Sequence, residues 1–211
     1  MSIGMDRTAY VYGAGGHSQV VADVLGDLGI SVTAFVNDYP NREHPKVTKT
    51  IPGVRVGRLE DFPELDAPLV LAVGNNQERK ELAAMLEVEW VSAIHSTATI
   101  AATVSLGEDN VILHRSIIQA NSSIGSHVLI NTAASVDHDN VIADYVHISP
   151  HVTLCGHVEV GEGTHIGAGA TVIPSVKIGA WCTIGAGAVV IDDIPDGSTA
   201  VGVPAKVVSS R

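Results

Sequence analysis

The chain has 211 residues and a formal net charge of −11, and 45% of its residues are apolar. This apolar fraction allows a folded core in one or two domains and argues against extensive disorder. The acidic balance argues against non-specific binding to nucleic acid or to anionic membranes, because both require clustered lysine and arginine.

The N-terminal half begins with a predicted strand, a glycine loop and a helix. Residues 8–12 favour a strand, residues 13–18 (GAGGHS) a turn, and residues 19–29 a helix with apolar side chains at i, i+3 and i+4. A helix that starts after glycines offers free N–H groups and a dipole to an anion. The third glycine of the dinucleotide-binding fingerprint is replaced by Ser18, so a tight turn without a ligand remains the alternative.

A second strand is expected at residues 31–39, and it ends in Asn37 and Asp38. An acidic residue about 20 positions after a glycine loop, at the end of a strand, contacts a ribose hydroxyl in nucleotide-binding βαβ units. Residues 39–63 hold prolines and charges and are expected to form a connecting loop with room for one short strand.

A further strand is expected at residues 67–76, where it ends in Gly74, Asn75 and Asn76. A helix at 77–86 and a strand at 89–94 follow. Because parallel strands present their carboxyl ends at one edge, these polar ends should converge where open α/β sheets bind ligands. We therefore predict a small Rossmann-like α/β domain over residues 1–92.

Aliphatic residues recur every six positions in the second half. Steps of six from Ile94 to Val190 reach seventeen positions, and all of them are Ile, Leu or Val. This period fits neither a helix nor an alternating strand and is typical of the hexapeptide repeats of a parallel β-helix. Three six-residue faces make a coil of about eighteen residues, so residues eighteen apart should stack. Residues 93–211 are therefore predicted to form this β-helix and a C-terminal tail.

Glycine often follows the aliphatic residue of the repeat, and we expect it to allow the tight corner between two faces. These glycines are Gly107, Gly125, Gly161, Gly167, Gly179 and Gly185. The hand of the coil does not follow from the period.

The segment SVDHDN places His138 between Asp137 and Asp139. Stacking by eighteen puts the small residues Ala120 and Gly156 beside it, which leaves room for a ligand against the imidazole. A carboxylate bonded to one ring nitrogen fixes the tautomer and raises the basicity of the other nitrogen. We expect Asp139 to do this, while Asp137 remains possible. His138 is therefore a candidate general base.

The remaining histidines and both cysteines are mostly expected to have structural roles. We expect His114, His127, His157 and His165 to lie at solvent-exposed corners, and Cys155 and Cys182 to be small buried residues of a reduced protein. The sequence has no GxSxG elbow, which favours direct acyl transfer over a covalent acyl-enzyme. His147 and His151 leave a zinc-dependent carbonic anhydrase as a distant alternative, although zinc needs three convergent ligands.

Several motifs together resemble one family. These are GAGGH, then ND, then AVGNN, followed by INTAASVDHDNVIADYVHISP and the tail GVPAKVV. The chain resembles the bacterial nucleotide-sugar acetyltransferases, above all the UDP-4-amino-sugar N-acetyltransferases of the bacillosamine pathway. Relatives acetylate GDP-perosamine or sialic acid. The resemblance implies a left-handed β-helix and a homotrimer with active sites between subunits.

The resemblance also implies roles for individual residues. Nucleotide-sugar contacts are expected from Gly15, Gly16, His17, Asn37, Asp38, Gly74 and Gln77. His138 looks like the catalytic base, and Asp139 stands where the closest relatives commonly have glutamate. Acetyl-CoA is the expected co-substrate, with no metal, and its contacts are expected from His147, Ala168, Ala186, Gly202, Pro204 and Lys206. The tail from Gly202 to Lys206 could equally cap the open end of the prism.

The resulting hypothesis is direct N-acetylation of a UDP-linked 4-amino-4,6-dideoxy sugar with acetyl-CoA as donor. A sugar O-acetyltransferase, a GDP-amino-sugar N-acetyltransferase and a non-catalytic scaffold are the alternatives. No stretch approaches about 18 uninterrupted apolar residues, and the N-terminus lacks a long apolar segment. We therefore expect a cytoplasmic protein that binds neither membranes nor nucleic acid.

Overall fold

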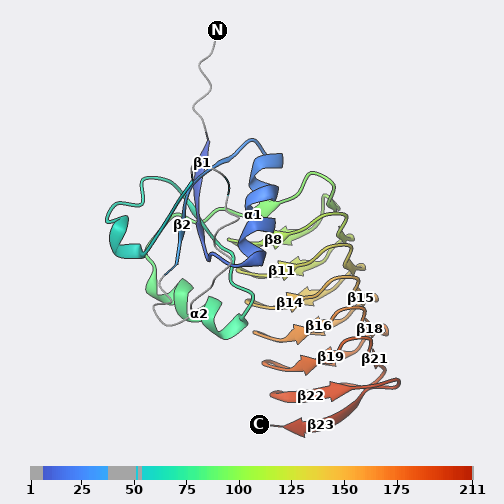
Figure 1. Ribbon diagram of the computed structural model, residues 1–211. Coiled ribbons are helices and arrows are strands. Elements are labelled where there is room, and N and C mark those ends of the chain that lie inside the picture. Colours follow the sequence, from blue (N-terminus) through green and yellow to red (C-terminus); the bar gives the residue numbers. More distant parts are fainter. Residues whose placement is uncertain (1–6, 38–50, 52–53, 211) are drawn as a thin grey trace.

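The structure is a computed structural model that describes residues 7–37, 51 and 54–210. An α/β unit packs against the side of a three-sided column of short strands, and the C-terminus lies at the far end of that column (Figure 1). Asp38 and most of the predicted connecting loop lie outside the described residues.

The N-terminal unit is a four-stranded parallel sheet in the order β3-β2-β1-β4. Its strands are β1 (Thr8–Tyr12), β2 (Ser31–Val36), β3 (Arg55–Gly57) and β4 (Leu69–Leu71), with a 3-10 helix at Leu59–Asp61. Helix α1 (Gly16–Asp27) connects β1 to β2, and α2 (Asn76–Met85) follows β4. The predicted Rossmann-like arrangement is confirmed, and β3 is the short strand for which the connecting loop left room.

The predicted strand at 89–94 is wrong. Trp90 makes only an isolated parallel bridge to Leu69 of the α/β sheet, whereas Ala93 and Ile94 form β5 (Ala93–Ile94) and pair with Val111 and Ile112. The segment was expected to form one strand because most of its residues are apolar. Its two ends pair with different sheets, so it is the crossing point between the two halves.

Both faces of the α/β sheet are covered, as a parallel sheet requires. Helix α1 buries Val21, Val24 and Leu25 in one apolar cluster with β1 and with Val111 and Leu129 of the column. The opposite face packs Tyr10, Tyr12 and Leu71, among others, against residues that include Leu82 and Leu86. Because α1 is shared between the sheet and the column, the two halves have a common apolar core.

The column is a parallel β-helix with a two-residue strand on every face. All seventeen aliphatic positions predicted from the six-residue period are the second residue of such a strand. The register is eighteen residues, as in Leu129, His147 and His165, which pair in sequence. The strands after β5 are β6 (Thr99–Ile100), β7 (Ser105–Leu106), β8 (Val111–Ile112), β9 (Ile117–Ile118), β10 (Ser123–Ile124), β11 (Leu129–Ile130), β12 (Ser135–Val136), β13 (Val141–Ile142), β14 (His147–Ile148), β15 (Thr153–Leu154), β16 (Glu159–Val160), β17 (His165–Ile166), β18 (Thr171–Val172), β19 (Lys177–Ile178), β20 (Thr183–Ile184) and β21 (Val189–Val190).

Three sheets form the faces of the prism. One contains β7, β10, β13, β16 and β19, and another contains β6, β9, β12, β15, β18 and β21. The third runs from β5 through β8, β11, β14, β17 and β20, and it is extended by β22 (Ser198–Val201) and the antiparallel β23 (Lys206–Ser210). We call this third sheet the domain-facing sheet, because β8 and β11 carry the residues that pack against α1.

The expected role of the repeat glycines is wrong. The turn conformation with positive φ falls three residues after the aliphatic residue, as at Asn121, Asp139 and Tyr145. Gly125 and Gly161 instead follow the aliphatic residue directly, and a Cβ there would collide with the backbone of the next coil. These glycines therefore permit close stacking of coils at one corner rather than an unusual backbone angle.

Candidate active site

His138 and Asp139 form a hydrogen-bonded pair at the corner after β12. The Nδ1–H of His138 donates to Oδ2 of Asp139 at 2.7 Å, and half of the imidazole side chain (49%) is exposed. Because Nδ1 carries the proton in this bond, Nε2 presents its lone pair. The pair thus has the tautomer that a general base requires.

The corner itself is fixed from inside the prism by Asn140. Its buried amide donates to the carbonyl oxygens of Asp137 and Cys155, and its Oδ1 accepts from the backbone of Val158. The side chain of Asp137 accepts from the backbone N–H of His138. Asp137 therefore supports the turn, and the carboxylate that bonds the imidazole is Asp139, as expected.

Neighbouring coils leave space at the ring and supply a second histidine. A Cβ at Gly156 would lie 2.6 Å from Cε1 of His138, so only glycine leaves the imidazole in this position. Nε2 of His157 lies 3.9 Å from Oδ2 of Asp139, and Asn121 donates to Oδ1 of Asp139 at 3.2 Å. His157 was expected only as a solvent-exposed corner residue and Asn121 had no predicted role, although each stands eighteen residues from Asp139.

Hydrogen bonding separates the pKa values of this pair. The hydrogen bond to Asp139, followed by the charges of Asp137 and Asp139, raises the pKa of His138. The same hydrogen bond, together with that from Asn121, lowers the pKa of Asp139. His138 is therefore a stronger base than a free imidazole, and Asp139 stays ionised to support it.

A second group of histidines lies where the α/β unit faces the column. His147 of β14 and His165 of β17 stack with ring centroids 4.6 Å apart, and His165 Nε2 is 2.9 Å from Oγ of Ser149. Burial, followed by the charges of neighbours that include Arg79 and His17, lowers the pKa of His147 to about 3. Burial also lowers the pKa of His17 to about 4 and lowers that of His165. All three rings are therefore neutral at physiological pH.

The polar ends of the parallel strands converge beside these rings. Gly15 precedes α1, and at Gly15, Gly16 and Gly74 there is open space where a Cβ would be. Asn37 follows β2 and donates its backbone N–H to Gly57. Gly74 and Gln77 line a cavity of about 240 Å³, shared with His165 and Thr183 of the domain-facing sheet. Of the predicted substrate residues only Asp38 lies outside the described chain.

The residues predicted to hold the co-substrate do not form one group. Ala168 and Ala186 are exposed and stacked at the corner after the domain-facing sheet, with the N–H of Gly187 bonded to the carbonyl of Ala168. The connection from β22 to β23 contains Gly202 and Pro204, and Lys206 is the first residue of β23. This segment lies at the end of the same corner. Lys206 Nζ lies 3.5 Å from Asp192.

His147 lies apart from Ala168 and Ala186, because it projects toward the α/β unit, where His17 also acts on it. Its Nδ1 is buried and makes no hydrogen bond among the described residues, while the nearby backbone of Gly74 favours the protonated ring only weakly. His138 lies after β12 on a different sheet from β14. Within one chain, the candidate base and the candidate sugar site therefore lie on different faces of the prism.

The expectation of solvent-exposed corner histidines is wrong for two of the four. His127 is buried and bonds Asp109 through Nδ1 at 2.8 Å, and His165 is part of the stacked pair. His114 is half-buried against the ring of His95, and His157 is exposed. The packing of the α/β unit on the column buries His127, and the six-residue period does not indicate this. The eighteen-residue register, by contrast, places His165 on His147 and His127 beside Asp109. Of the two free cysteines, Cys182 is buried and Cys155 is half-buried.

Side chains of the types that bind metal ions come together at one place among the described residues. Among the described residues, three ligand-type side chains approach one another in the group His138, Asp139 and His157, and neither His147 nor His151 belongs to it. The short bond between His138 and Asp139 accounts for this group without an ion. Neither described helix is long and apolar enough to cross a bilayer.

Comparisons with known proteins identify both halves of the chain. Residues 9–86 match the PglD N-terminal domain, and residues 141–173 and 157–192 match the bacterial transferase hexapeptide (six repeats). The column is thus a left-handed β-helix of the hexapeptide type. An uncharacterized protein of Acanthamoeba polyphaga mimivirus is 32% identical over 118 residues, which is 55% of this chain, and the chain spans only 23% of that protein.

Solved structures match almost the whole chain. GDP-perosamine N-acetyltransferase (PerB) from Caulobacter crescentus, in complex with CoA and GDP-perosamine, is 37% identical with a TM-score of 0.87, over 96% of this chain and 97% of that one. The acetyltransferase domain of PglB from Neisseria gonorrhoeae, in complex with acetyl coenzyme A, is 36% identical with a TM-score of 0.85, over 97% and 100%. WeeI from Acinetobacter baumannii is 26% identical with a TM-score of 0.82, over 96% and 100%. With this identity along nearly its entire length, the chain belongs to the hexapeptide-repeat acetyltransferases of nucleotide-linked sugars.

Proposed function

We propose that this protein transfers the acetyl group of acetyl-CoA to the amino group of a nucleotide-linked amino sugar, with His138 as general base. The observation that carries the proposal is the 2.7 Å bond from Nδ1 of His138 to Asp139, which leaves Nε2 as a raised-pKa base on a half-exposed ring that packs against Gly156. An imidazole of this kind can remove a proton from an attacking amine.

The chemical step is a direct substitution. The sugar nitrogen attacks the thioester carbonyl, the new C–N bond forms as the C–S bond breaks, and the amine proton passes to Nε2 of His138. The His138 imidazolium then returns this proton to the leaving sulfur, which departs as the CoA thiol. Asp139 stabilises the imidazolium that forms on the way. Neither cysteine has a basic partner among the described contacts, so the proposal includes no acyl-enzyme.

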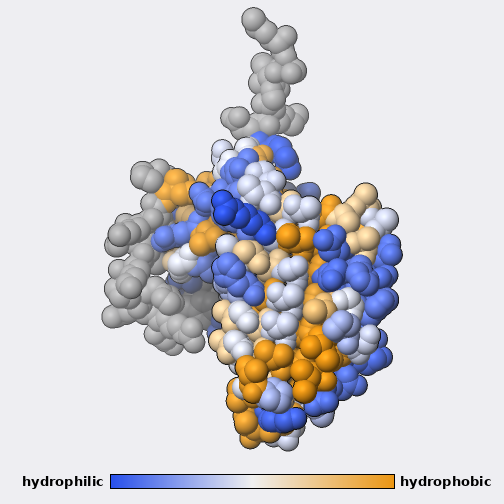
Figure 2. Space-filling view, turned by 90° about the vertical axis from the view of Figure 1, so that its right-hand side faces the viewer, coloured by the Kyte–Doolittle hydropathy of each residue, from blue (hydrophilic) through white to orange (hydrophobic). Residues whose placement is uncertain are grey.

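Two copies of the chain are needed to complete this site in the proposed trimer. Within one chain His138 and the glycine loop lie on different faces of the prism, so the base of one subunit would serve the sugar held by its neighbour. Apolar residues gather over the lower end of the prism in Figure 2, and the exposed ones include Ile173, Ile191 and Val203. The pantetheine arm would run between neighbouring prisms, along Ala186 and Gly202.

The nucleotide sugar would bind at the carboxyl edge of the α/β sheet. Gly15 and Gly16 leave space for phosphates at the N-terminus of α1, where free N–H groups favour anions. Two nucleotides are candidates: the sequence resemblance favours UDP, and the Caulobacter relative was solved with GDP-perosamine. Asn37, Asp38 and Gln77 are the proposed contacts to the nucleoside side.

The proposal is tested by following thiol release from acetyl-CoA with UDP- and GDP-linked sugars that carry an amine or a hydroxyl at C4. We expect release with an amino sugar, and a fall in kcat of about 10²–10⁴ in His138→Ala with the fold unchanged. His114→Ala, a half-buried histidine that contacts Asp23 of α1 and the ring of His95, is the control and should keep wild-type turnover.

Each contrary outcome has a definite meaning. Turnover of the hydroxyl sugar alone would establish an O-acetyltransferase, and the absence of thiol release with every acceptor would leave a scaffold. Wild-type turnover by His138→Ala would remove His138 from the chemistry.

A further inference from the structure

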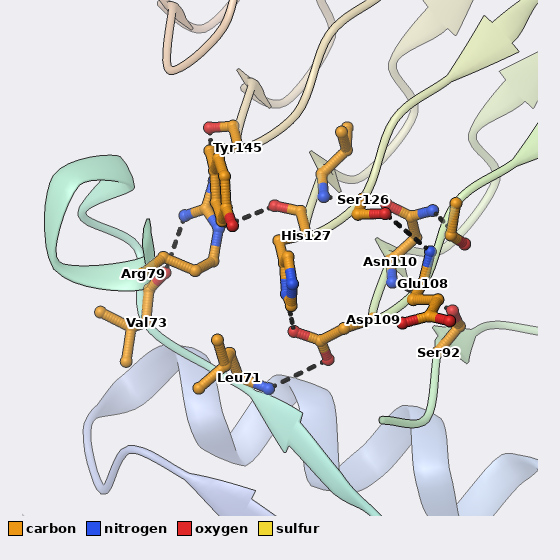
Figure 3. A network of polar contacts seen from close by, with 12 residues as sticks. Leu71, Val73, Arg79, Ser92, Glu108, Asp109, Asn110, Ser126, His127 and Tyr145 are labelled. Atoms are coloured by element: carbon orange, nitrogen blue, oxygen red, sulfur yellow. Dashed lines mark hydrogen bonds and ion pairs between the residues drawn. The ribbon is translucent and has the colours of Figure 1, made fainter. Parts of the chain in front are cut away.

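We propose that Arg79 is a positioning residue that holds the Gly74–Gln77 wall of the nucleotide-sugar site at a fixed height on the β-helix. The inference rests on the proposed function, because it concerns the site assigned above to the nucleotide sugar. Figure 3 shows the guanidinium of Arg79 beside Tyr145 and His127, with Asp109 reaching from His127 to the backbone of Leu71.

Arg79 ties the loop before α2 to two successive coils. Its side chain is only 2% exposed, Nη1 donates to the carbonyl of Val73 at 2.9 Å, and Nη2 donates to Oδ1 of Asn76 at 3.0 Å. Nε donates to the carbonyl of His127 at 2.8 Å and Nη2 to that of Tyr145 at 2.7 Å. One planar group therefore joins both ends of the loop to corners that stand eighteen residues apart.

Asn76 extends the same attachment to a third coil. Its amide donates to the carbonyl of Gly163 at 2.9 Å and reaches that of Thr164 at 3.3 Å. His127, Tyr145 and Gly163 all have positive φ and occupy the same corner in consecutive coils. Because the loop is bonded to three levels of the column, it cannot slide along the prism axis without breaking several buried hydrogen bonds.

The contacts of the Arg79 guanidinium fix the position of the loop and do not pair its charge with a carboxylate. Among the described contacts, the guanidinium bonds only carbonyl oxygens and an amide, and no carboxylate touches it. The charge of Asp109 acts on it from behind His127. A lysine ammonium is a point charge and cannot span the same four acceptors, so the planar fork of arginine is required.

The position of the loop matters because it forms one wall of the cavity of about 240 Å³. Gly74, Asn75 and Gln77 line one side, while His165 and Thr183 of the β-helix line the other. A shift of the loop along the column would change the width of this cavity and the position of Gly74 over His147. Misplacement of a binding wall by about 1 Å costs up to about 10² in rate or affinity.

The test compares Arg79→Lys with Lys80→Ala by isothermal titration and steady-state kinetics. Lys80 is the neighbouring residue on α2, and its exposed ammonium bridges Glu162 of the same corner. We expect Arg79→Lys to raise Kd and KM for the nucleotide sugar on the order of tenfold or more. The Kd and KM for acetyl-CoA should stay within about twofold, and Lys80→Ala should leave both ligands unaffected. A purely structural arginine would lower the active fraction and leave both affinities unchanged.

Asn76→Ala provides a second variant should Arg79→Lys not fold, and the same selective loss is expected from it. Equal loss for both ligands, or no loss for the nucleotide sugar, would overturn the inference. UDP and GDP serve as titrants if the wild type turns over no sugar. In that case selective loss of their binding supports the positioning role while the transferase proposal fails, and no binding by the wild type overturns both.

Discussion

At the scale of single residues, the proposed chemistry depends on two adjacent side chains and on what stacks beside them. Asp139 has positive φ, and from this turn its carboxylate reaches back to Nδ1 of the preceding histidine. Gly156, eighteen residues from His138, leaves the ring its place. In this arrangement Nδ1–H of His138 donates to the carboxylate of Asp139, and Nε2 keeps a free lone pair. A general base needs this state before its substrate binds.

The first prediction concerns pH and Asp139. In Asp139→Asn the carboxylate that raises the pKa of His138 is lost, so the imidazole becomes neutral at lower pH than in the wild type. The acidic limb of kcat/KM should move to lower pH while the plateau falls by on the order of tenfold or more. The sugar amine contributes a limb that both proteins share, so the difference between the two profiles isolates His138.

Identical acidic limbs in the two proteins would show that Asp139 does not act on the base. Glu64→Gln, which removes an exposed carboxylate of the α/β unit, is the matched control and should reproduce the wild-type profile.

The second prediction concerns stability and Asp109. Burial is the main cause that raises the pKa of this carboxyl from 3.8 to about 6. Because the pKa of Asp109 is higher in the folded chain than in the unfolded chain, its protonated carboxyl contributes to the free energy of unfolding. This contribution is fully present below about pH 3.8 and is lost as the pH rises through about 6. The free energy of unfolding of the wild type should therefore fall between pH 4 and 6.5 relative to Asp109→Asn, by at most roughly 3 kcal/mol.

Urea unfolding at several pH values measures this difference. Asparagine keeps an acceptor for the N–H of Leu71 but changes the bond to Nδ1 of His127, so the prediction concerns the pH dependence of the difference and not its absolute size. Parallel pH profiles for the two proteins would mean that Asp109 ionises as easily in the folded chain as in the unfolded one.

At the scale of elements, the β-helix is built from strands too short to be stable alone. Each strand has two residues, and its stability comes from the aliphatic residue that stacks on identical positions one coil above and below. The interior is one continuous apolar cluster from Ile112 to Ala205. Helix α1 likewise depends on tertiary packing, because its apolar stripe is buried by the sheet and the column together.

The third prediction follows from this ladder. Ile148 is fully buried between Ile130 and Ile166, so Ile148→Ala should cost about 2–5 kcal/mol of unfolding free energy through lost contacts and a cavity. Ile117 occupies the outward position of β9, and Ile117→Ala should change stability by about 0.5 kcal/mol or less. Urea denaturation of both variants is the measurement, and similar losses for the two would contradict an inward-facing ladder.

At the scale of the whole molecule, the separation of the two candidate sites is the feature with the largest consequence. His138 lies after β12, and the glycine loop faces the sheet that contains β14. A protein that needs both for one reaction must bring two copies together, and a cyclic assembly places the same pair of surfaces at every interface.

The fourth prediction is therefore complementation between inactive variants. When His138→Ala and His17→Ala chains are co-expressed and assemble at random, one interface in four should combine an intact base with an intact loop, giving roughly a quarter of wild-type activity. Each variant alone, and the two purified separately and mixed without subunit exchange, should stay inactive. No recovery in verified mixed oligomers would place the complete site within one chain.

The sequence by itself determined the β-helix, the α/β unit and the pairing of His138 with a neighbouring carboxylate. These follow from strictly local rules: a six-residue period needs an inward aliphatic residue at each step, and adjacent residues at a corner are in reach of each other. The same rules misjudged residues 89–94 and the repeat glycines, because an apolar run does not say which sheet its residues join and spacing does not say which atom would crowd a Cβ.

The tertiary structure alone decided how the α/β unit sits on the column. That packing buried His127 and Asp109 and turned Arg79 of the polar helix α2 into a buried attachment. No local pattern encodes these outcomes, because they depend on contacts between residues 48 to 66 positions apart. The environment of each group, and with it the pKa and the chemistry, exists only once those distant segments meet.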